Sequence, residues 1–217
     1  MYVPPAFRED RPEVLRAAIR ATGLAILVSH GPEGIVASHV PMLLDDAGGA
    51  NGTLLGHIAR ANTQWRQSTP DIPALAIFPG PDAYISPSWY ATKRVTGKVV
   101  PTWNYVAVHA YGQLVFFDDP GELRALVSRL TSVREAGRPV PWAVTDAPAD
   151  FVASQVKGIV GFRLAITRLE GKWKMSQNRP MADRLGVIDG LRQQAEPTGA
   201  AVANLVRASL RGAKLDP

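Results

Sequence analysis

The stretch Pro101-Thr-Trp-Asn-Tyr-Val-Ala-Val-His-Ala-Tyr-Gly-Gln-Leu-Val-Phe-Phe117 decides the fold. Valine, leucine and aromatic residues fill it, and such residues favour strands, so it predicts one long β-strand around Trp103 to Phe117. A helix signal follows at once, because Asp119-Pro120-Gly121-Glu122 is typical of a helix N-terminus and precedes apolar residues at helical spacing. A long strand that runs directly into an amphipathic helix is therefore the centre of the predicted fold.

Five further segments are predicted to be strands, and turn residues separate them. The segments are Leu24 to His30, Ile35 to Met42, Thr53 to Ile58, Ala74 to Phe78 and Ile159 to Leu169. Gly31-Pro32-Glu33-Gly34 predicts a hairpin turn, and residues 45–52 predict a mobile surface loop. Strands and helices do not alternate regularly, which argues against a Rossmann sheet. The prediction is a mainly β, α+β fold, in the form of an antiparallel barrel with peripheral helices.

The peripheral helices are predicted from capping signals and apolar spacing. Asp10-Arg11-Pro12-Glu13 has capping-box spacing and opens a helix that is expected to stop near Gly23. Weaker helical patterns run from Ala149 to Val156, from Met181 to Gln194 and from Thr198 to Leu210.

Composition limits the chemistry that the chain can perform. With 217 residues, 46% of them hydrophobic and 20% charged, the chain reads as one globular domain. It shows no signal peptide and no apolar run near the roughly 20 residues of a membrane span, so we expect a cytoplasmic protein that does not enter membranes. The absence of cysteine excludes disulfides, thiolate metal sites and a cysteine nucleophile. Redox chemistry would therefore need a cofactor, and the net charge of +5 suits a partner that carries phosphate.

The strand residues Val36 to Pro41 contain two adjacent polar side chains. Alternation places Ser38 on the face of Val36 and Val40, and it places His39 on the opposite face. They could contact a ligand, or they could be a hydrogen-bonded core serine and a partly exposed histidine.

A second candidate lies where the strand that contains His57 gives way to a short helical segment. Backbone N–H groups at such a junction can hold an anion, and Arg60 could clamp a phosphate through two hydrogen bonds. The alternatives are a surface salt bridge for Arg60 and a helix cap for Asn62.

Two later stretches are dense in aromatic and cationic residues. Tyr84 to Tyr90 and Val99 to Tyr105 could stack on a planar ring while nearby lysines meet its phosphate, or they could form a core edge under a basic loop. Trp173 to Arg179 is rich in amide and cationic donors, and by itself it also reads as a helix entry.

Taken together, these motifs resemble those of a known family. They are, in order, Tyr2, Pro4 and Phe7, then ASHVP, GHIARAN–QW, YISPSWY, VPTWNYVAVHAYG and KMSQNR. The chain is similar to the PaiB-type proteins, which are described as FMN-binding negative transcriptional regulators. The resemblance spans Met1 to Gln194, which gives an expected FMN-binding domain over residues 1–194 and a helical tail over 195–217. Thr63 departs from the proline expected there, which affects only local rigidity.

The resemblance implies an FMN-binding split β-barrel like that of pyridoxamine-phosphate oxidase, and a homodimer with FMN at the subunit interface. It implies roles for nine residues: Ser38 and His39 beside the isoalloxazine edge; His57, Arg60 and Asn62 around the phosphate and ribityl chain; Thr102 and Trp103 approaching the flavin; and Gln177 and Asn178 closing the site.

The resemblance also implies a function, negative regulation of transcription. DNA contact could come from the cations Arg207, Arg211 and Lys214 of the tail, unless the tail is a solvated or dimer-packing helix. The alternative is an FMN-dependent oxidoreductase, a flavin reductase or small-molecule oxidase, in which strand histidines could move protons. A third interpretation makes those histidines ligands of haem or a metal, although no paired ligand spacing favours it.

Overall fold

A computed structural model describes residues 1–194 and 196–211, with the side chain of Arg211 outside the description. The chain divides into two compact units. Unit 1 comprises residues 1–15, 79–108 and 170–217, and unit 2 comprises residues 16–78 and 109–169. Among the described residues, none of the helices combines the length and apolar character that a membrane crossing requires.

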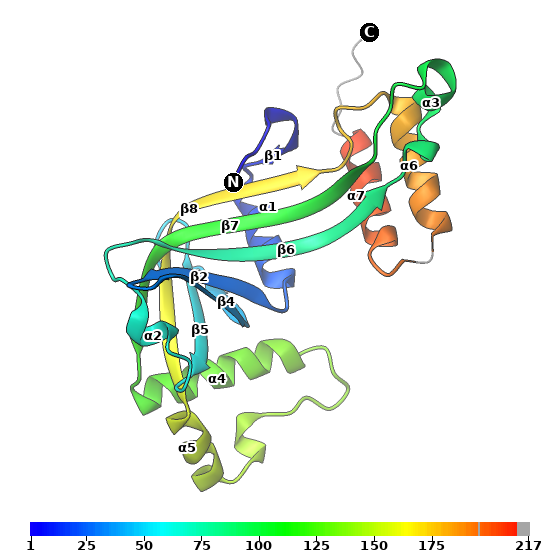
Figure 1. Cartoon of the computed structure of the whole chain (residues 1–217). Helices are drawn as coiled ribbons and strands as arrows, with labels where there is room; N and C mark the ends of the chain where they lie inside the picture. The colour runs from blue at the N-terminus through cyan, green and yellow to red at the C-terminus, as the bar shows by residue number, and fades with distance from the viewer. Residues whose placement is uncertain (195, 212–217) are drawn as a thin grey trace. The chain divides into compact units, whose positions relative to one another are not determined.

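The strands form one antiparallel sheet, as the sequence predicts. The strands are β1 (Arg8–Glu9), β2 (Ala25–Gly31), β3 (Gly34–Val40), β4 (Met42–Asp45), β5 (Thr53–Ala59), β6 (Ala74–Ile85), β7 (Thr102–Phe117) and β8 (Ile159–Lys174). Their order is β3-β2-β6-β7-β8-β5-β4, with β1 paired to β8 (Figure 1). The long neighbours β6, β7 and β8 each contribute residues to both units.

The five helices predicted from capping and spacing are confirmed. The helices are α1 (Pro12–Ala21), α2 (Gln64–Gln67), α3 (Ala91–Thr96), α4 (Pro120–Glu135), α5 (Ala149–Lys157), α6 (Met181–Gln193) and α7 (Gly199–Arg211). The start of α4 shows why the local signal worked, because the Asp119 carboxylate accepts a hydrogen bond of 2.9 Å from the N–H of Glu122.

In unit 2, α4 packs on the sheet through apolar side chains. Leu126 and Leu130 of α4 are buried with Leu43 of β4, and Leu55 and Phe117 pack against this cluster. A second cluster joins α4 to α5 through Leu123 and other buried residues, Val144, Val152 and Val156. The α4–α5 segment is thus held to the β4, β5 and β8 side of unit 2.

In unit 1, α6 and α7 build a separate core with the ends of β6 and β7. The buried residues include Ile85 and Val106 from the strands, Val187 and Leu191 from α6, and Val206 from α7. Figure 1 shows α6 and α7 side by side. The apolar face of α7 is therefore a packing surface.

Three strand predictions needed correction: the predicted strand Ile159 to Leu169 runs on to Lys174, and the other two involve proline. The predicted strand Ile35 to Met42 breaks at Pro41 into β3 and β4, because proline cannot donate to a strand ladder. The predicted strand Ala74 to Phe78 continues through Pro79 and Pro81 to Ile85. The prolines are tolerated there because the β2 register ends at Ile77, which leaves the following part of β6 without that partner.

Candidate functional site

In unit 2 the structure brings together Ser38 and Asn62, two of the predicted site residues. The Asn62 amide donates a 2.8 Å hydrogen bond to Ser38 Oγ, which links β3 to the turn after β5. Asn62 Oδ1 accepts from the N–H of Gln64 at 2.9 Å, so Asn62 also orders the entry to α2, although the N-cap position itself is Thr63. The fully buried Gln64 amide donates to Leu27 O and Ser29 Oγ. The junction after β5 is therefore fixed by side-chain hydrogen bonds.

Arg60 lies at the same junction, and most of its donors are already engaged. Its Nε donates to Lys157 O at 2.8 Å, and Nη2 donates to Ile159 O at 3.1 Å. Nη1 lies 3.4 Å from the carboxylate of Asp118, whose side chain is 68% exposed. The guanidinium ties the end of β5 to the α5–β8 connection, and its Nη1 is already paired with Asp118, so its role as a phosphate clamp stays a prediction.

The two histidines of the prediction lie in different surroundings. His39 is exposed on the face of β3 opposite Ser38, as alternation predicts. His57 lies opposite Gly161 of β8, and the ring of Phe117 covers that glycine. The buried His57 Nδ1 has no hydrogen-bond partner among the residues that the structure describes, and burial lowers the pKa of this imidazole. His57 is thus held as a neutral group with a nitrogen that could still bind a partner.

In unit 1, Lys174 of β8 holds the start of β7. The ammonium donates to Thr102 Oγ1 and, at 2.6 Å, to Trp103 O. The Trp103 side chain is 53% exposed and meets Tyr84 edge to face, with ring centroids 6.0 Å apart. This exposed aromatic pair is a surface on which a planar ring could stack.

Gln177 and Asn178 follow β8 in a tight turn. Gln177 accepts from the N–H of Met175 and donates to Trp173 O, each at 2.6 Å, so its side chain is used inside the turn. Ser176 has a left-handed backbone (φ 60°), and its hydroxyl bonds to the buried Asn104 amide at 3.0 Å. The turn directs Asn178 into a small recess that Thr102 also lines.

This recess of about 90 Å³ brings together two predicted residues, Thr102 and Asn178, with residues outside the predicted set. It is lined by Tyr90, Val100, Pro101, Thr102, Asn104, Lys174, Ser176, Asn178 and Arg179. Lys174 and Arg179 stand in the KMSQNR motif and Tyr90 ends the YISPSWY motif, so the motifs were the available signal. Of the nine predicted residues, Thr102, Trp103, Gln177 and Asn178 lie in unit 1, and the other five lie in unit 2.

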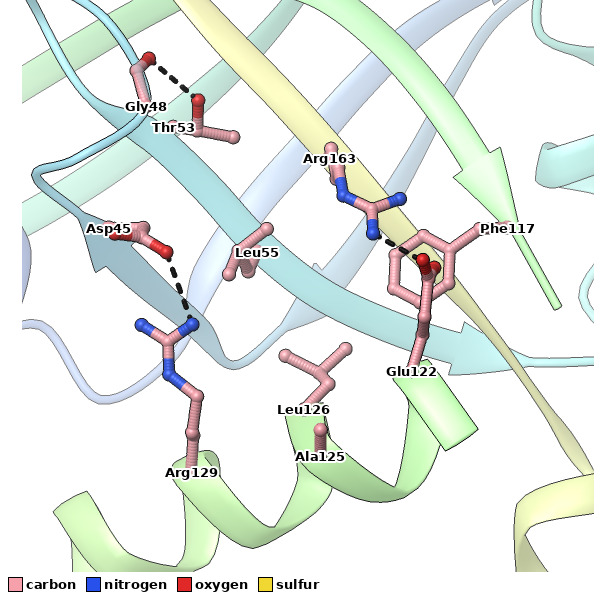
Figure 2. A pocket seen from close by; sticks show the side chains of 10 residues that line it. All are labelled: Asp45, Gly48, Thr53, Leu55, Phe117, Glu122, Ala125, Leu126, Arg129 and Arg163. Carbon is pink, nitrogen blue, oxygen red and sulfur yellow. Dashed lines mark hydrogen bonds and ion pairs between the residues drawn. The ribbon is translucent and has the colours of Figure 1, made fainter. Parts of the chain in front are cut away.

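Unit 2 holds a larger cavity of about 370 Å³ between α4 and the strands β5 and β8. Figure 2 shows Leu126 of α4 opposite Leu55 of β5, with an ion pair on either side. Arg129 bonds to Asp45 at 3.1 Å, and Arg163 bonds to Glu122 at 2.8 Å. None of the nine predicted residues lines this cavity, and its charges pair with one another, so we describe it as the packing seam of α4.

Comparison with known proteins agrees with the predicted resemblance. Residues 1–168 match the family described as "Putative FMN-binding domain". A relative from Bacillus subtilis, "Protease synthase and sporulation protein PAI 2", is 30% identical over 97% of this chain and 99% of its own length.

Solved structures support the fold. A conserved hypothetical protein from Mycobacterium tuberculosis has a TM-score of 0.57 at 11% identity, covering 83% of this chain and 94% of that one. The FAD and heme binding protein from Mycobacterium smegmatis has a TM-score of 0.53 at 15% identity, covering 77% and 73%. At these identities the likeness concerns the fold alone, and the predicted antiparallel split-barrel class is confirmed.

Proposed function

Because the chain belongs to the PaiB-type FMN-binding family, we propose that it binds FMN in the cell. The observation that carries the proposal is the Ser38–Asn62 hydrogen bond. It joins two residues, 24 positions apart, that the resemblance assigned independently to the flavin. A neighbour in fold, from Mycobacterium smegmatis, binds FAD.

The residues present suit such a cofactor. FMN carries a phosphate, ribityl hydroxyls and a ring with hydrogen-bonding edges, so it needs cations and neutral polar groups together. In unit 2 these groups are the Arg60 guanidinium and His57 Nδ1, which has no partner among the described residues, and in unit 1 Trp103 and Asn178 supply aromatic and amide groups. Ser38 and His39 would lie beside the ring edge, and His57, Arg60 and Asn62 beside the phosphate and ribityl chain. Thr102 and Trp103, of the same or the partner chain, would approach the flavin, and Gln177 and Asn178 would close the site. When bound, FMN would supply the redox chemistry that a chain without cysteine lacks.

A partner chain is the second part of the proposal, since the resemblance implies a homodimer. Ile35 on the exposed face of β3 is 77% exposed, and Ala37 and His39 on the same face are also exposed. Their β2 partners Val28 and Ile26 extend this face with half-buried apolar side chains. A second copy could cover it and complete the flavin site.

Titration with FMN tests the cofactor assignment. The wild-type chain should turn yellow and quench flavin fluorescence, and light scattering on the same sample should give the mass of two chains. His39→Ala should weaken FMN binding by about tenfold, because a hydrogen bond to the ring would be lost. Arg124→Ala, at an exposed position of α4 outside that face, is the control and should bind like wild type. A chain that neither contains nor takes up FMN would overturn the proposal.

We also propose that the FMN-bound protein lowers transcription by contacting DNA. Of the three tail cations, Arg207 is exposed on α7, the side chain of Arg211 is outside the description, and Lys214 lies outside the described residues. The apolar face of α7 packs in unit 1, which leaves the face of Arg207 to solvent.

Binding of promoter DNA at increasing salt tests this role. Affinity should fall steeply with salt, by a slope of about 0.9 for each phosphate contacted, and neutralising Arg207, Arg211 and Lys214 should abolish binding. Arg192→Ala, an exposed arginine of α6, serves as the control and should have no effect. NAD(P)H oxidation by the flavin-loaded chain, without any binding of DNA, would instead identify the alternative, an oxidoreductase.

A further inference from the structure

The small recess of unit 1 is lined by hydrogen-bond donors and no carboxylate. Its polar side chains are Tyr90, Thr102, Asn104, Lys174, Ser176, Asn178 and Arg179. Two of them are cations, and neither has an ion pair among the residues that the structure describes. A cavity of this composition is complementary to a negative charge.

Lys174 is held in place with one donor to spare. Two of its three N–H groups are directed at Thr102 Oγ1 and Trp103 O, which fixes the ammonium at the wall of the recess. Burial lowers the pKa of Lys174, and the nearby cations Lys172 and Arg179 lower it further. The folded chain therefore carries here a concentration of positive charge that an anion would relieve.

Tyr90 supplies a second unsatisfied donor. The residue is 1% exposed, it lines the recess, and its hydroxyl has no hydrogen-bond partner among the described residues. The Arg179 guanidinium lies over the Tyr90 ring, 4.9 Å from its centroid, in a cation–π contact. Burial raises the pKa of Tyr90, and Arg179 opposes that change in part, so the hydroxyl keeps its proton as a donor. Buried hydroxyls without a partner are uncommon, and a ligand is one explanation for this one.

We propose that this recess is an oxyanion site, in which Tyr90 Oη, the third N–H of Lys174 and the Arg179 guanidinium bind a phosphate or carboxylate group. The site goes beyond the flavin proposal, because it would exist whether or not the chain holds FMN.

The size of the recess limits what enters it. Sites that enclose a whole small-molecule ligand measure roughly 300 to 1,000 Å³, whereas this one measures about 90 Å³. Only an anionic head group fits, with the rest of its molecule outside. That head group is either the phosphate of FMN or the anionic group of a separate substrate.

Inorganic phosphate is the direct probe, and the rise in melting temperature with phosphate concentration reports its binding to the intact chain. Arg179→Gln should weaken phosphate binding by at least about tenfold, since a charged hydrogen bond is lost. Tyr90→Phe should weaken it by about threefold or more and, because the hydroxyl has no partner, should leave the phosphate-free protein as stable as wild type. The surface control Lys93→Gln should match wild type in both measurements.

Competition identifies the source of the anion. If phosphate displaces FMN, and Arg179→Gln weakens FMN but not riboflavin, the recess holds the flavin phosphate. If phosphate binds equally well to the FMN-loaded chain, the recess serves a separate anionic ligand. The oxyanion site is overturned if phosphate binds equally well to wild type, Arg179→Gln and Tyr90→Phe. It is also overturned if phosphate does not bind at tens of millimolar, even where FMN binds. Phosphate binding without FMN binding would overturn only the flavin proposal.

Discussion

Replacing Gly186 by alanine should destabilise the protein by more than about 3 kcal/mol, although alanine is the better helix former by about 1 kcal/mol. Gly186 lies inside α6, where a Cβ would stand 2.0 Å from the backbone oxygen of Trp89. Backbone on the opposing side cannot rotate away as a side chain can, so α6 would have to move. A loss of stability would therefore show that packing against Trp89 outweighs helix propensity, and a gain would show the reverse.

Urea unfolding measures this change, with Gly137→Ala as the control because nothing lies within 4 Å of its added Cβ. The control should keep the wild-type midpoint. Since Trp89 precedes Tyr90, any folded Gly186→Ala protein should also bind phosphate less well. A gain in stability would show that α6 does not pack against Trp89 as the structure has it.

Gly112→Ala should have an equally large effect in unit 2. Gly112 is in β7, and an added Cβ would lie 1.9 Å from the backbone oxygen of Ala165 in β8. Two neighbouring strands would have to separate, which breaks ladder hydrogen bonds as well as packing, so we expect a loss of more than about 3 kcal/mol.

Soluble yield and urea midpoint check the second prediction. Gly23→Ala is its control, because the space around Gly23 is open. A Gly112→Ala chain that unfolds at the wild-type midpoint would contradict the close approach of β7 and β8. The steric requirement gives the glycine that ends VAVHAYG a physical reason.

Elements with local signals were predictable from the sequence. Asp119 caps α4 through a residue three positions away, and alternation along β3 separates Ser38 from His39 without reference to the rest of the fold. The extension of β6 was missed because the effect of Pro79 and Pro81 depends on where a partner strand stops.

The candidate site was less predictable because its chemistry depends on distant partners. Arg60 was expected to grip phosphate, yet Lys157 O and Ile159 O, almost 100 positions away, already occupy two of its donor groups. The oxyanion recess needs Lys174 beside Thr102. These residues are 72 positions apart in the sequence, and no sequence pattern predicts their contact. The resemblance to family motifs identified the KMSQNR segment, but it did not identify which hydrogen-bond donors line the recess.

The composition of unit 1 sets the order in which it can form during protein synthesis. Residues 1–15 join residues 170–217 in this unit: Arg8 of β1 lies opposite Lys172, and Leu15 fills the space beside Gly171. At roughly 5 to 20 residues per second, the ribosome takes on the order of ten to thirty seconds to supply those later partners. Until then the leading segment has no strand to pair with. Unit 1 therefore completes its folding late in synthesis. Slowed translation or ribosome stalling before residue 170 would leave its first strand unpaired for longer.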